Sequence, residues 1–463
     1  MEKSKIGSSD RIHFVGIGGI GMSGLAQVMK DIGFNVQGSD VVNSKNVERC
    51  KKNGIKVFTK HNSKNIINST IVVRSSAIKN NNPEIKAAKK KKLTILKRAE
   101  MLAHVVSLKK NIVITGSHGK TTTTSLISRI LYEAKLDPTI INGGIINSIK
   151  SSARFGRGDW AVLEADESDG SFLNFPINYS VVTNIDKEHI DFYKSFNNLK
   201  KSFVKFINKT PTIGKAFLCA DDKEIKKIIP QIQNKSFLTY GFSKNANFKI
   251  LNAVYKKDYS TFDLRISTRG LKNTIIKKIK LNLIGPYNVL NSASAIALCL
   301  HIGIGINIIK NALSKFTGIQ RRLTKVFDIN GREFFDDYAH HPTEIKSVLN
   351  SVRMTYRNRK IISVFQPHRY SRLKLLKEDF ASSFKDSNLV ILCPVYPAGE
   401  KIDVKYKELD FANLITKNSK VQVITIKNEK YLRKFFIKNL VSNELIICMG
   451  AGSISKWIRE MNL

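Results

Sequence analysis

Short apolar runs typical of strands alternate along the chain with apolar residues at helical spacing, and together they predict an α/β protein. The run IHFV at 12–15 is followed by the glycine-rich GIGGIG, by apolar residues at helical spacing over 22–29, and by the strand-like FNVQ at 34–37. The run NIVIT at 111–115 opens a second series in the same way, with a glycine-containing loop and then a helical pattern. Strand, turn, helix and strand in this order predict βαβ units with parallel sheets.

The same patterns continue along the chain and divide it into three sets. Further strands are expected at 71–73, 160–165, 180–183, 325–328, 361–365, 389–393, 421–425 and 445–449. Residues 246–282 alternate between polar and apolar, as antiparallel strands do. We therefore predict three α/β domains: a Rossmann-like domain at 1–107, a P-loop-type central domain with a mostly parallel sheet at 108–320, and a Rossmann-like domain at 321–463.

Composition places these domains in the cytoplasm of a cell. No run of about 18 apolar residues is present, so we expect no membrane span. The first ten residues, MEKSKIGSSD, are polar and lack the apolar segment of a secretory signal. The five cysteines are scattered without a C-x-x-C pair, which is typical of free thiols in a reducing compartment.

The net charge is +40, from 77 basic and 37 acidic residues, and a large positive charge is common in nucleic-acid-binding proteins. The basic runs, however, lie in polar segments without interleaved aromatic residues, as at 89–92. No RNP, KH, zinc-finger or helix-turn-helix signature is present. We therefore expect a charge spread over solvated faces and no nucleic-acid partner, although a basic field would also attract phosphorylated substrates.

The stretch ITGSHGKTTTT at 114–124 has the context of a phosphate-binding loop, because a strand enters it and a helix leaves it. Its spacing is shorter than the Walker A pattern G-x-x-x-x-G-K-[ST], since Gly116 precedes Gly119 by only three residues. Lys120 is expected at the loop surface, where it would reach the terminal phosphates, and the Thr121 hydroxyl would bind Mg²⁺. A polar turn that caps a helix is the alternative interpretation of Gly-Lys-Thr.

Polar clusters at two later strand ends favour the nucleotide interpretation. Glu164 ends the apolar run WAVLE and is followed by DESD, while the run SVVT is followed by Asn184, Asp186 and His189. In an open α/β sheet, ligands bind outside the carboxyl ends of the strands. Carboxylate oxygens there are suitable ligands for Mg²⁺.

The segments GSHGKTTTT, EADESDGSF and TNIDKEHIDFY, in this order, resemble the ATP-binding centre of the Mur ligases. These ATP-dependent amide ligases build the peptide of peptidoglycan, and their loop is G-x-x-G-K-[ST], the spacing found here. The resemblance implies ATP and Mg²⁺ (or Mn²⁺) as cofactors. The residues it implies for metal binding are Thr121, Glu164 and His189. Those implied for ATP are Gly116, Ser117, His118, Gly119, Lys120, Thr121, Thr122, Asn288, Asn291, Arg321 and Asp336.

Motifs across nearly the whole chain are similar to those of the Mur ligases that add L-alanine to UDP-N-acetylmuramate: HFVGIGGIGMSGLA, GSD, SSAI, FTGIQRR, DDYAHHPTEI, FQPHRYSR, VYPAGE and GAGSI. The resemblance implies UDP-N-acetylmuramate, L-alanine and ATP as substrates. It implies a UDP-sugar site formed by Gly16, Gly18, Gly19, Gly21, Ser39, Asp40, Ser75 and Ser76. It implies catalytic roles for Lys120, His189, His340 and Arg369.

Alanine offers few handles, and its carboxylate is best bound by the fork of an arginine. Arg369 and Arg372 in FQPHRYSR follow the strand-like run IISVF, so they are expected at a strand end of the third domain. The resemblance adds Tyr338 and His340 to this amino-acid site. The alternative is that these arginines are ordinary surface charge in a basic chain.

Two other enzymes remain as alternatives. Gly16-x-Gly18-x-x-Gly21 with Asp40 nineteen residues later is a dinucleotide fingerprint and indicates an NAD-dependent oxidoreductase if taken by itself. A dehydrogenase, however, needs no second nucleotide loop with acidic strand ends. The other alternative is the recycling ligase that attaches a tripeptide to the same UDP-sugar, whose glycine turn typically reads G-I-C-G-T rather than GIGGIG.

Three positions depart from the family pattern. Ser117 stands where threonine is commoner, and Glu188 stands where the family has aspartate before His189. Tyr287 in GPYNVLN replaces a histidine, which puts the contact to the nucleoside in doubt, although a tyrosine can stack on adenine.

Overall fold

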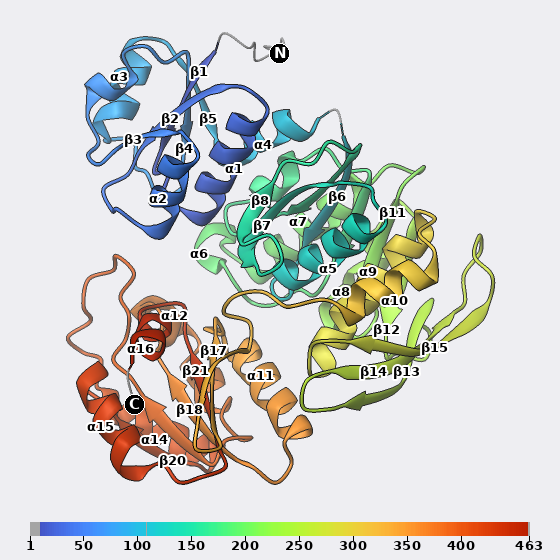
Figure 1. Ribbon diagram of the computed structural model, residues 1–463, viewed down its shortest axis with the longest axis vertical. Helices are drawn as coiled ribbons and strands as arrows, with labels where there is room; N and C mark the ends of the chain where they lie inside the picture. The colour runs from blue at the N-terminus through green and yellow to red at the C-terminus, as the bar shows by residue number, and fades with distance from the viewer. Residues whose placement is uncertain (1–9, 108, 462–463) are drawn as a thin grey trace. The chain divides into compact units, whose positions relative to one another are not determined.

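The computed structural model describes residues 10–107 and 109–461 (Figure 1). Most of the N-terminal segment judged to carry no signal, and residue 108 at the expected first domain boundary, lie outside the described residues. The chain divides into two compact units, of which the first comprises Met1–Asn252, Phe262–Lys280 and Leu290–Thr317. The second comprises Ala253–Thr261, Leu281–Val289 and Gly318–Leu463.

The first unit begins with a five-stranded parallel sheet in the order β3-β2-β1-β4-β5, which is the strand order of a Rossmann fold. Its strands are β1 (Arg11–Val15), β2 (Asn35–Ser39), β3 (Lys56–Phe58), β4 (Ile71–Arg74) and β5 (Thr94–Lys97). Its helices are α1 (Ile20–Asp31), α2 (Lys45–Lys52), η1 (Ser63–Ile66), α3 (Pro83–Lys90) and α4 (Arg98–Val106). Asn82 caps α3 ahead of Pro83 at the first helical position, where a missing N–H costs nothing.

A ten-stranded sheet follows, in the order β15-β14-β13-β12-β11-β10-β6-β9-β7-β8. Its strands are β6 (Lys110–Thr115), β7 (Thr139–Ile146), β8 (Ser151–Arg154), β9 (Trp160–Glu164), β10 (Tyr179–Val182), β11 (Lys215–Cys219), β12 (Phe237–Gly241), β13 (Phe248–Tyr255), β14 (Ser260–Ile266) and β15 (Thr274–Leu281). The associated helices are α5 (Lys120–Glu133), η2 (Ser171–Asn174), α6 (Ile190–Tyr193), α7 (Phe196–Asn208), α8 (Lys223–Ile228), η3 (Ile229–Gln231), α9 (Pro286–His301) and α10 (Ile306–Ser314). Strands β10, β6 and β9 run parallel at its centre, so their carboxyl ends meet at one edge.

Helix α1 of the five-stranded sheet packs on β7 and β8 of the ten-stranded sheet. A Cβ at Gly24 of α1 would lie only 2.8 Å from Cβ of Ala153, which is closer than real side chains approach. The close approach therefore depends on glycine at position 24.

The second unit contains a six-stranded sheet in the order β16-β17-β21-β18-β19-β20, parallel except for β16. Its strands are β16 (Thr324–Ile329), β17 (Arg332–Asp337), β18 (Lys360–Phe365), β19 (Leu389–Leu392), β20 (Gln422–Thr425) and β21 (Glu444–Met449). Its helices are α11 (Pro342–Thr355), α12 (Tyr370–Leu375), α13 (Lys377–Ala381), α14 (Glu408–Ser419), α15 (Glu429–Asn439) and α16 (Ile454–Glu460). Two buried apolar clusters, one containing Phe365 and Ile447 and the other Val364 and Cys448, form its core.

The predicted α/β class and the mostly parallel central sheet are confirmed. Strands β7 and β8 were not predicted, because TIINGGII contains two glycines and SSAR has no apolar alternation. β7 pairs with β9 and β8 pairs with β7, and both strands pack against α1. Among the described residues, no helix is long and apolar enough to span a membrane.

Candidate active site

The loop between β6 and α5 has a backbone that only glycine accommodates at two positions. Gly116 has φ of +129°, and a Cβ there would lie 2.1 Å from Oγ1 of Thr183. Gly119 has φ of +82° and caps α5, and a Cβ there would lie 2.7 Å from Oδ1 of Asn291 in α9. The shortened spacing therefore corresponds to a specific tight turn, with Asn291 directly beside its second glycine.

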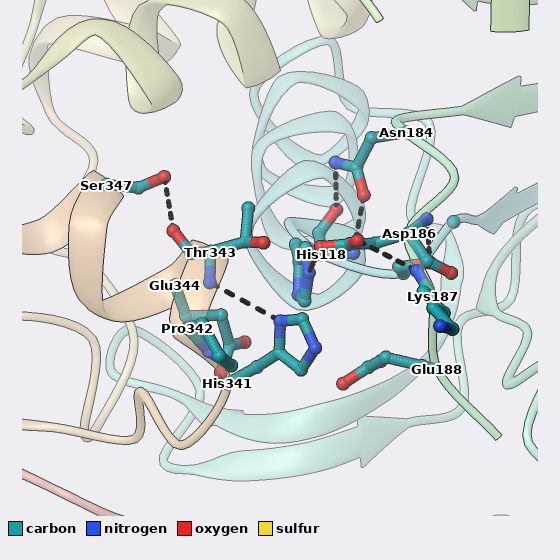
Figure 2. Close-up of polar contacts among 12 residues, drawn as sticks. His118, Asn184, Asp186, Lys187, Glu188, His341, Pro342, Thr343, Glu344 and Ser347 are labelled. Atoms are coloured by element: carbon teal, nitrogen blue, oxygen red, sulfur yellow. Dashed lines mark hydrogen bonds and ion pairs between the residues drawn. The ribbon is translucent and has the colours of Figure 1, made fainter. Parts of the chain in front are cut away.

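The end of β10 holds this loop in place (Figure 2). The Asn184 side chain accepts a hydrogen bond from N–H of His118 at 2.8 Å and donates to its carbonyl oxygen at 2.9 Å. The ring of His118 lies 3.0 Å from the carboxylate of Asp186. The backbone N–H of Asp186 donates to Oγ of Ser117 at 2.8 Å. The polar residues predicted at this strand end thus fix the loop conformation.

Helix α5 begins directly after this loop. The N–H groups of a first helical turn have no acceptor within the helix. Together with the positive end of the helix dipole, they form a favourable site for an anion. Thr121 and Thr122 lie in this turn and are mostly buried. The geometry suits the phosphates of a nucleotide.

Lys120 is more enclosed than the sequence indicated, since its side chain is only 13% exposed. Its ammonium donates to the carbonyl oxygens of Gly116 at 2.6 Å and Ser117 at 3.1 Å, and it lies 2.9 Å from a carboxylate oxygen of Glu167. Burial opposes the charged form, but the carboxylates of Glu167, Asp166 and Glu164 outweigh it and raise the pKa of Lys120. The lysine therefore carries a fixed positive charge at the loop.

Glu164, at the end of β9, faces the first turn of α5. One carboxylate oxygen accepts from the hydroxyl of Thr121 at 3.1 Å, and the other accepts from N–H of Gly143 at 2.6 Å. A hydroxyl and a carboxylate are both oxygen donors of the kind that Mg²⁺ prefers. These two predicted metal ligands are therefore adjacent, and their chemistry fits the cation.

His189, the third predicted ligand, lies beside two other carboxylates. The ligand atoms of Asp166, Glu167 and His189 are all within 4.8 Å of one another. Glu167 is fully buried, and burial together with Asp166 and Glu188 raises its pKa to about 7 against the attraction of Lys120. His189 occupies a left-handed backbone conformation with φ of +55°, which directs its ring from the start of α6.

The glycine turn after β1 is organised by the end of β2. N–H of Gly16 and N–H of Ile17 donate to the carbonyl oxygen of Ser39 at 2.8 and 3.0 Å. The carboxylate of Asp40 accepts from N–H of Gly18 at 2.8 Å, and Gly19 caps α1. The predicted residues of this turn are therefore brought together at the N-terminus of α1.

Ser39 takes part through its backbone, because its side chain is fully buried. Its hydroxyl lies 2.6 Å from Glu84 and 2.9 Å from the ring of His61. Burial alone would raise the pKa of Glu84, but hydrogen bonds with His13, Ser39 and Asn65 lower it to about 2. The network of Glu84 with His13, Ser39, His61 and Asn65 therefore holds the end of β2 in place.

A cavity of about 460 Å³ in the first unit is lined by residues of the glycine turn and of the strand ends of the central sheet. One group of its lining residues comes from the glycine turn, β4 and the β5–α4 junction: Gly19, Gly21, Met22, Arg74, Ser75, Ser76, Lys97, Arg98 and Ala99. The other comes from the central sheet and its strand ends: Ile141, Asn142, Gly143, Glu164, Asp166, Ser168, Asp169, Ser171 and Phe192. The predicted serines and the predicted metal ligand Glu164 therefore share one cavity.

In the second unit, the predicted residues Arg321 and Asp336 lie together. Arg321 donates to the carbonyl oxygen of Gly450 at 2.6 Å and stacks on Tyr338 at 4.7 Å. Asp336 is fully buried and binds Arg459 and Ser455 of α16 at 2.9 and 2.7 Å. The Asp336 carboxylate thus holds α16 against β17. Arg321 is the more exposed of the two residues.

The predicted amino-acid residues also form one cluster. The ring of His340 lies 5.1 Å from that of Tyr338 and 5.8 Å from that of His368, and Nη1 of Arg372 lies 3.3 Å from Nδ1 of His368. Burial and the neighbouring His340, Arg372 and Arg369 lower the pKa of His368 to about 4, so it is neutral and accepts from Arg372. The adjoining His341 caps α11 and accepts from N–H of Thr343 at 3.4 Å (Figure 2).

Arg369 begins α12 with an unusual backbone, φ of +72° and ψ of +131°. Its N–H donates to the carbonyl oxygen of Tyr396, and the carboxylate of Glu400 binds the hydroxyl and N–H of the adjacent Ser371. VYPAGE and FQPHRYSR, two motifs far apart in the sequence, are thus joined at the carboxyl end of β18.

Tyr287, the departure from the family pattern, is half-buried in the second unit. Burial and Asp337 raise its pKa, so the phenol is neutral. The neighbouring Asn288 donates to the carbonyl oxygen of Ile284 at 2.9 Å. Tyr287 therefore packs as a neutral side chain at the start of α9.

Sequence reasoning did not single out Glu167 among the acidic residues after β9. An irregular loop has no periodicity, so the sequence gives no sign of which carboxylate turns inward. It also gave no role to Glu400 or Arg98, which belong to elements distant in sequence from the motifs they contact.

Models of the Mur ligase family match the chain in three consecutive stretches. The model of the family's catalytic domain matches residues 11–110, the middle-domain model residues 114–299, and the glutamate-ligase-domain model residues 321–452. The UDP-N-acetylmuramate–L-alanine ligase of Pelagibacter ubique is 55% identical over 459 residues, covering 99% of both chains. The protein of the same name from Rickettsia felis is 42% identical and covers 98% of this chain and 96% of its own length.

Solved structures of similar fold are also Mur ligases. The UDP-N-acetylmuramate-alanine ligase of Thermotoga maritima superposes with a TM-score of 0.80 at 27% identity, covering 97% of both chains. A murein peptide ligase from Psychrobacter arcticus, at 19% identity with a TM-score of 0.71 over 98% of this chain and all of its own, shares the fold. The family models, the full-length relatives and the glycine loop with its acidic strand ends all agree: this chain belongs to the Mur ligase family.

Proposed function

We propose that this chain is a cytoplasmic, ATP-dependent ligase that joins L-alanine to the carboxylate of UDP-N-acetylmuramate in peptidoglycan synthesis. The observation that carries the proposal is the 55% identity, over essentially the full length, to a ligase of that name. The short phosphate loop, the carboxylates at the strand ends and the His340–Arg372 cluster supply the chemistry this reaction needs. The domains would be 1–107 for the UDP-sugar, 108–320 for ATP and 321–463 for the amino acid.

In the first step, an oxygen of the muramate carboxylate attacks the γ-phosphorus of ATP, and ADP leaves. Both reactants are anions, so the site has to neutralise charge more than it has to supply a nucleophile. Lys120, with its raised pKa, and the first turn of α5 contribute fixed positive charge for this purpose. The product is an acyl phosphate.

Mg²⁺ (or Mn²⁺) would be held by Thr121 and Glu164, with His189 as a third ligand. The adjacent hydroxyl and carboxylate support this assignment. The cation supplies Lewis-acid neutralisation of the phosphate oxygens. The protein residues orient it, and the N–H of Gly143 fixes the second oxygen of Glu164.

In the second step, the amine of L-alanine attacks the acyl carbonyl, and the tetrahedral intermediate expels phosphate. Arg369 and Arg372 would bind the alanine carboxylate, with Tyr338 and His340 beside it. The neutral His368 supports this role, because it accepts from Arg372 and so orients that guanidinium without competing for the anion. Exclusion of water protects the acyl phosphate from hydrolysis.

The test is phosphate release from ATP with UDP-N-acetylmuramate, supplying each amino acid and the recycling tripeptide in turn. We expect turnover with L-alanine and little with the tripeptide. Turnover with the tripeptide alone would identify the recycling ligase, and hydride transfer with NAD would identify the oxidoreductase.

A further inference from the structure

A half-buried arginine lies against the glycine turn of the five-stranded sheet. Arg98 begins α4, and Gly21 lies in the first turn of α1. A Cβ at Gly21 would lie 3.1 Å from Nη1 and 3.3 Å from Cζ of Arg98. The missing side chain at position 21 therefore leaves room for the guanidinium to lie over the start of α1.

This guanidinium has no hydrogen bond or ion pair with any residue of the described stretches 10–107 and 109–461. Arg74 on the same wall of the cavity is, by contrast, bound to Asn80 at 2.6 Å. A partly desolvated guanidinium is stabilised by an anion that satisfies its N–H groups. Arg98 lines the 460 Å³ cavity together with Ser75 and Ser76, so an anion in that cavity can reach it.

The cavity lining also includes the acidic residues Glu164, Asp166 and Asp169 from the central sheet. Arg98 lines the same cavity as these carboxylates. An anionic ligand at the glycine turn would be repelled by these carboxylates unless a cation stood beside it. Arg98 is a cation that lies against Gly21 of the turn and lines the cavity that also contains these carboxylates.

We propose that Arg98 binds the diphosphate of UDP-N-acetylmuramate, completing the site made by the glycine turn and the first turn of α1. The inference rests on the proposed function and adds a substrate-binding residue to it. The planar fork of arginine matches two phosphate oxygens, and helix N-termini favour the same group. Gly21 is accordingly the glycine that admits Arg98, in addition to any contact it makes with the ligand.

The test is calorimetric binding of UDP, UDP-N-acetylglucosamine and UDP-N-acetylmuramate to wild type and Arg98→Gln. Loss of a charge-assisted pair predicts dissociation constants raised about 10- to 100-fold for all three, since all carry the diphosphate. Weakening confined to UDP-N-acetylmuramate would mean that Arg98 holds the muramate carboxylate, and unchanged binding would mean that it holds neither. Either result overturns the assignment, whereas failure of the wild type to bind UDP-N-acetylmuramate would overturn the proposed function instead.

Two further variants separate binding from structure. Arg49 in α2 is another half-buried arginine of the same domain, but it does not line the cavity. Arg49→Gln should therefore leave all three affinities unchanged. Gly21→Ala should weaken binding in the wild-type background by displacing Arg98, but add little in the Arg98→Gln background. Full additivity of the two changes would show that Gly21 and Arg98 act independently and would refute the role assigned to Gly21 in admitting Arg98.

Discussion

Replacing Lys120 with alanine removes the ammonium that lies 2.9 Å from the fully buried carboxylate of Glu167. Two hydrogen bonds to the loop carbonyls of Gly116 and Ser117 are lost as well. Breaking a buried ion pair costs up to about 3–5 kcal/mol, because the remaining carboxyl either stays charged without a partner or has to take up a proton. Removal of a charge-stabilising group from a phosphoryl-transfer site is expected to lower kcat about 10²–10³-fold.

The double variant Lys120→Ala/Glu167→Gln separates these two effects. Glu167→Gln removes the carboxyl that has lost its partner, so it should recover most of the lost stability, while turnover stays low because the cation is still missing. In a calorimetric melt, 3 kcal/mol corresponds to a fall of about 5 °C in the transition of a unit of this size. Lys223→Ala, an exposed lysine of α8, is the matched control and should change neither quantity.

Two results would refute this reasoning. If Lys120→Ala keeps more than about a tenth of the wild-type rate, the lysine does not stabilise the transferred phosphate. If the double variant melts no higher than the single one, Glu167 is not the source of the instability.

Three other predictions follow from the site and its surroundings. Glu164→Gln and His189→Ala should each raise the Mg²⁺ concentration needed for half-maximal activity, and unchanged metal dependence in both would contradict the ligand assignment. Arg369→Lys and Arg372→Lys keep the charge but lose the fork, so each should raise the KM for alanine far more than that for ATP or UDP-N-acetylmuramate; equal changes in all three would place the alanine carboxylate elsewhere. Glu84→Gln should destabilise the protein at pH 7 by about 3 kcal/mol, because folding lowers the pKa of Glu84 from 4.5 to about 2. This stabilisation is fully present above pH 4.5 and is lost as the pH falls toward 2. Urea unfolding at pH 7 and pH 3 should show the gap to wild type narrowing at the lower pH, and a constant gap would show that the ionic network is not its cause.

Local patterns were sufficient for the elements that carry the chemistry. The run NIVIT and the following glycines predicted β6, the phosphate loop and α5, because strand, turn and helix each have a short-range signal. The strand-end residues Glu164 and His189 were singled out for the same reason, since parallel strands bring their carboxyl ends to one edge. Their role as metal ligands stays a prediction.

Contacts between distant segments could not be predicted from these patterns. The enclosure of Lys120 depends on which acidic residue of an irregular loop turns inward, and that residue is Glu167. The burial of the Ser39 hydroxyl depends on Glu84 in α3, forty-five residues away. In both cases the decisive partner is fixed by tertiary packing and leaves no trace in the local sequence pattern.

The backbone of Arg369 has a consequence for laboratory evolution of this protein. A non-glycine residue at φ of +72° carries about 1–2 kcal/mol of strain that glycine would relieve. A screen that rewarded heat resistance alone would therefore enrich Arg369→Gly, whereas growth that depended on the cell wall would eliminate it. The outcome of the two selections at this single position would report whether the strain is retained for the guanidinium it presents.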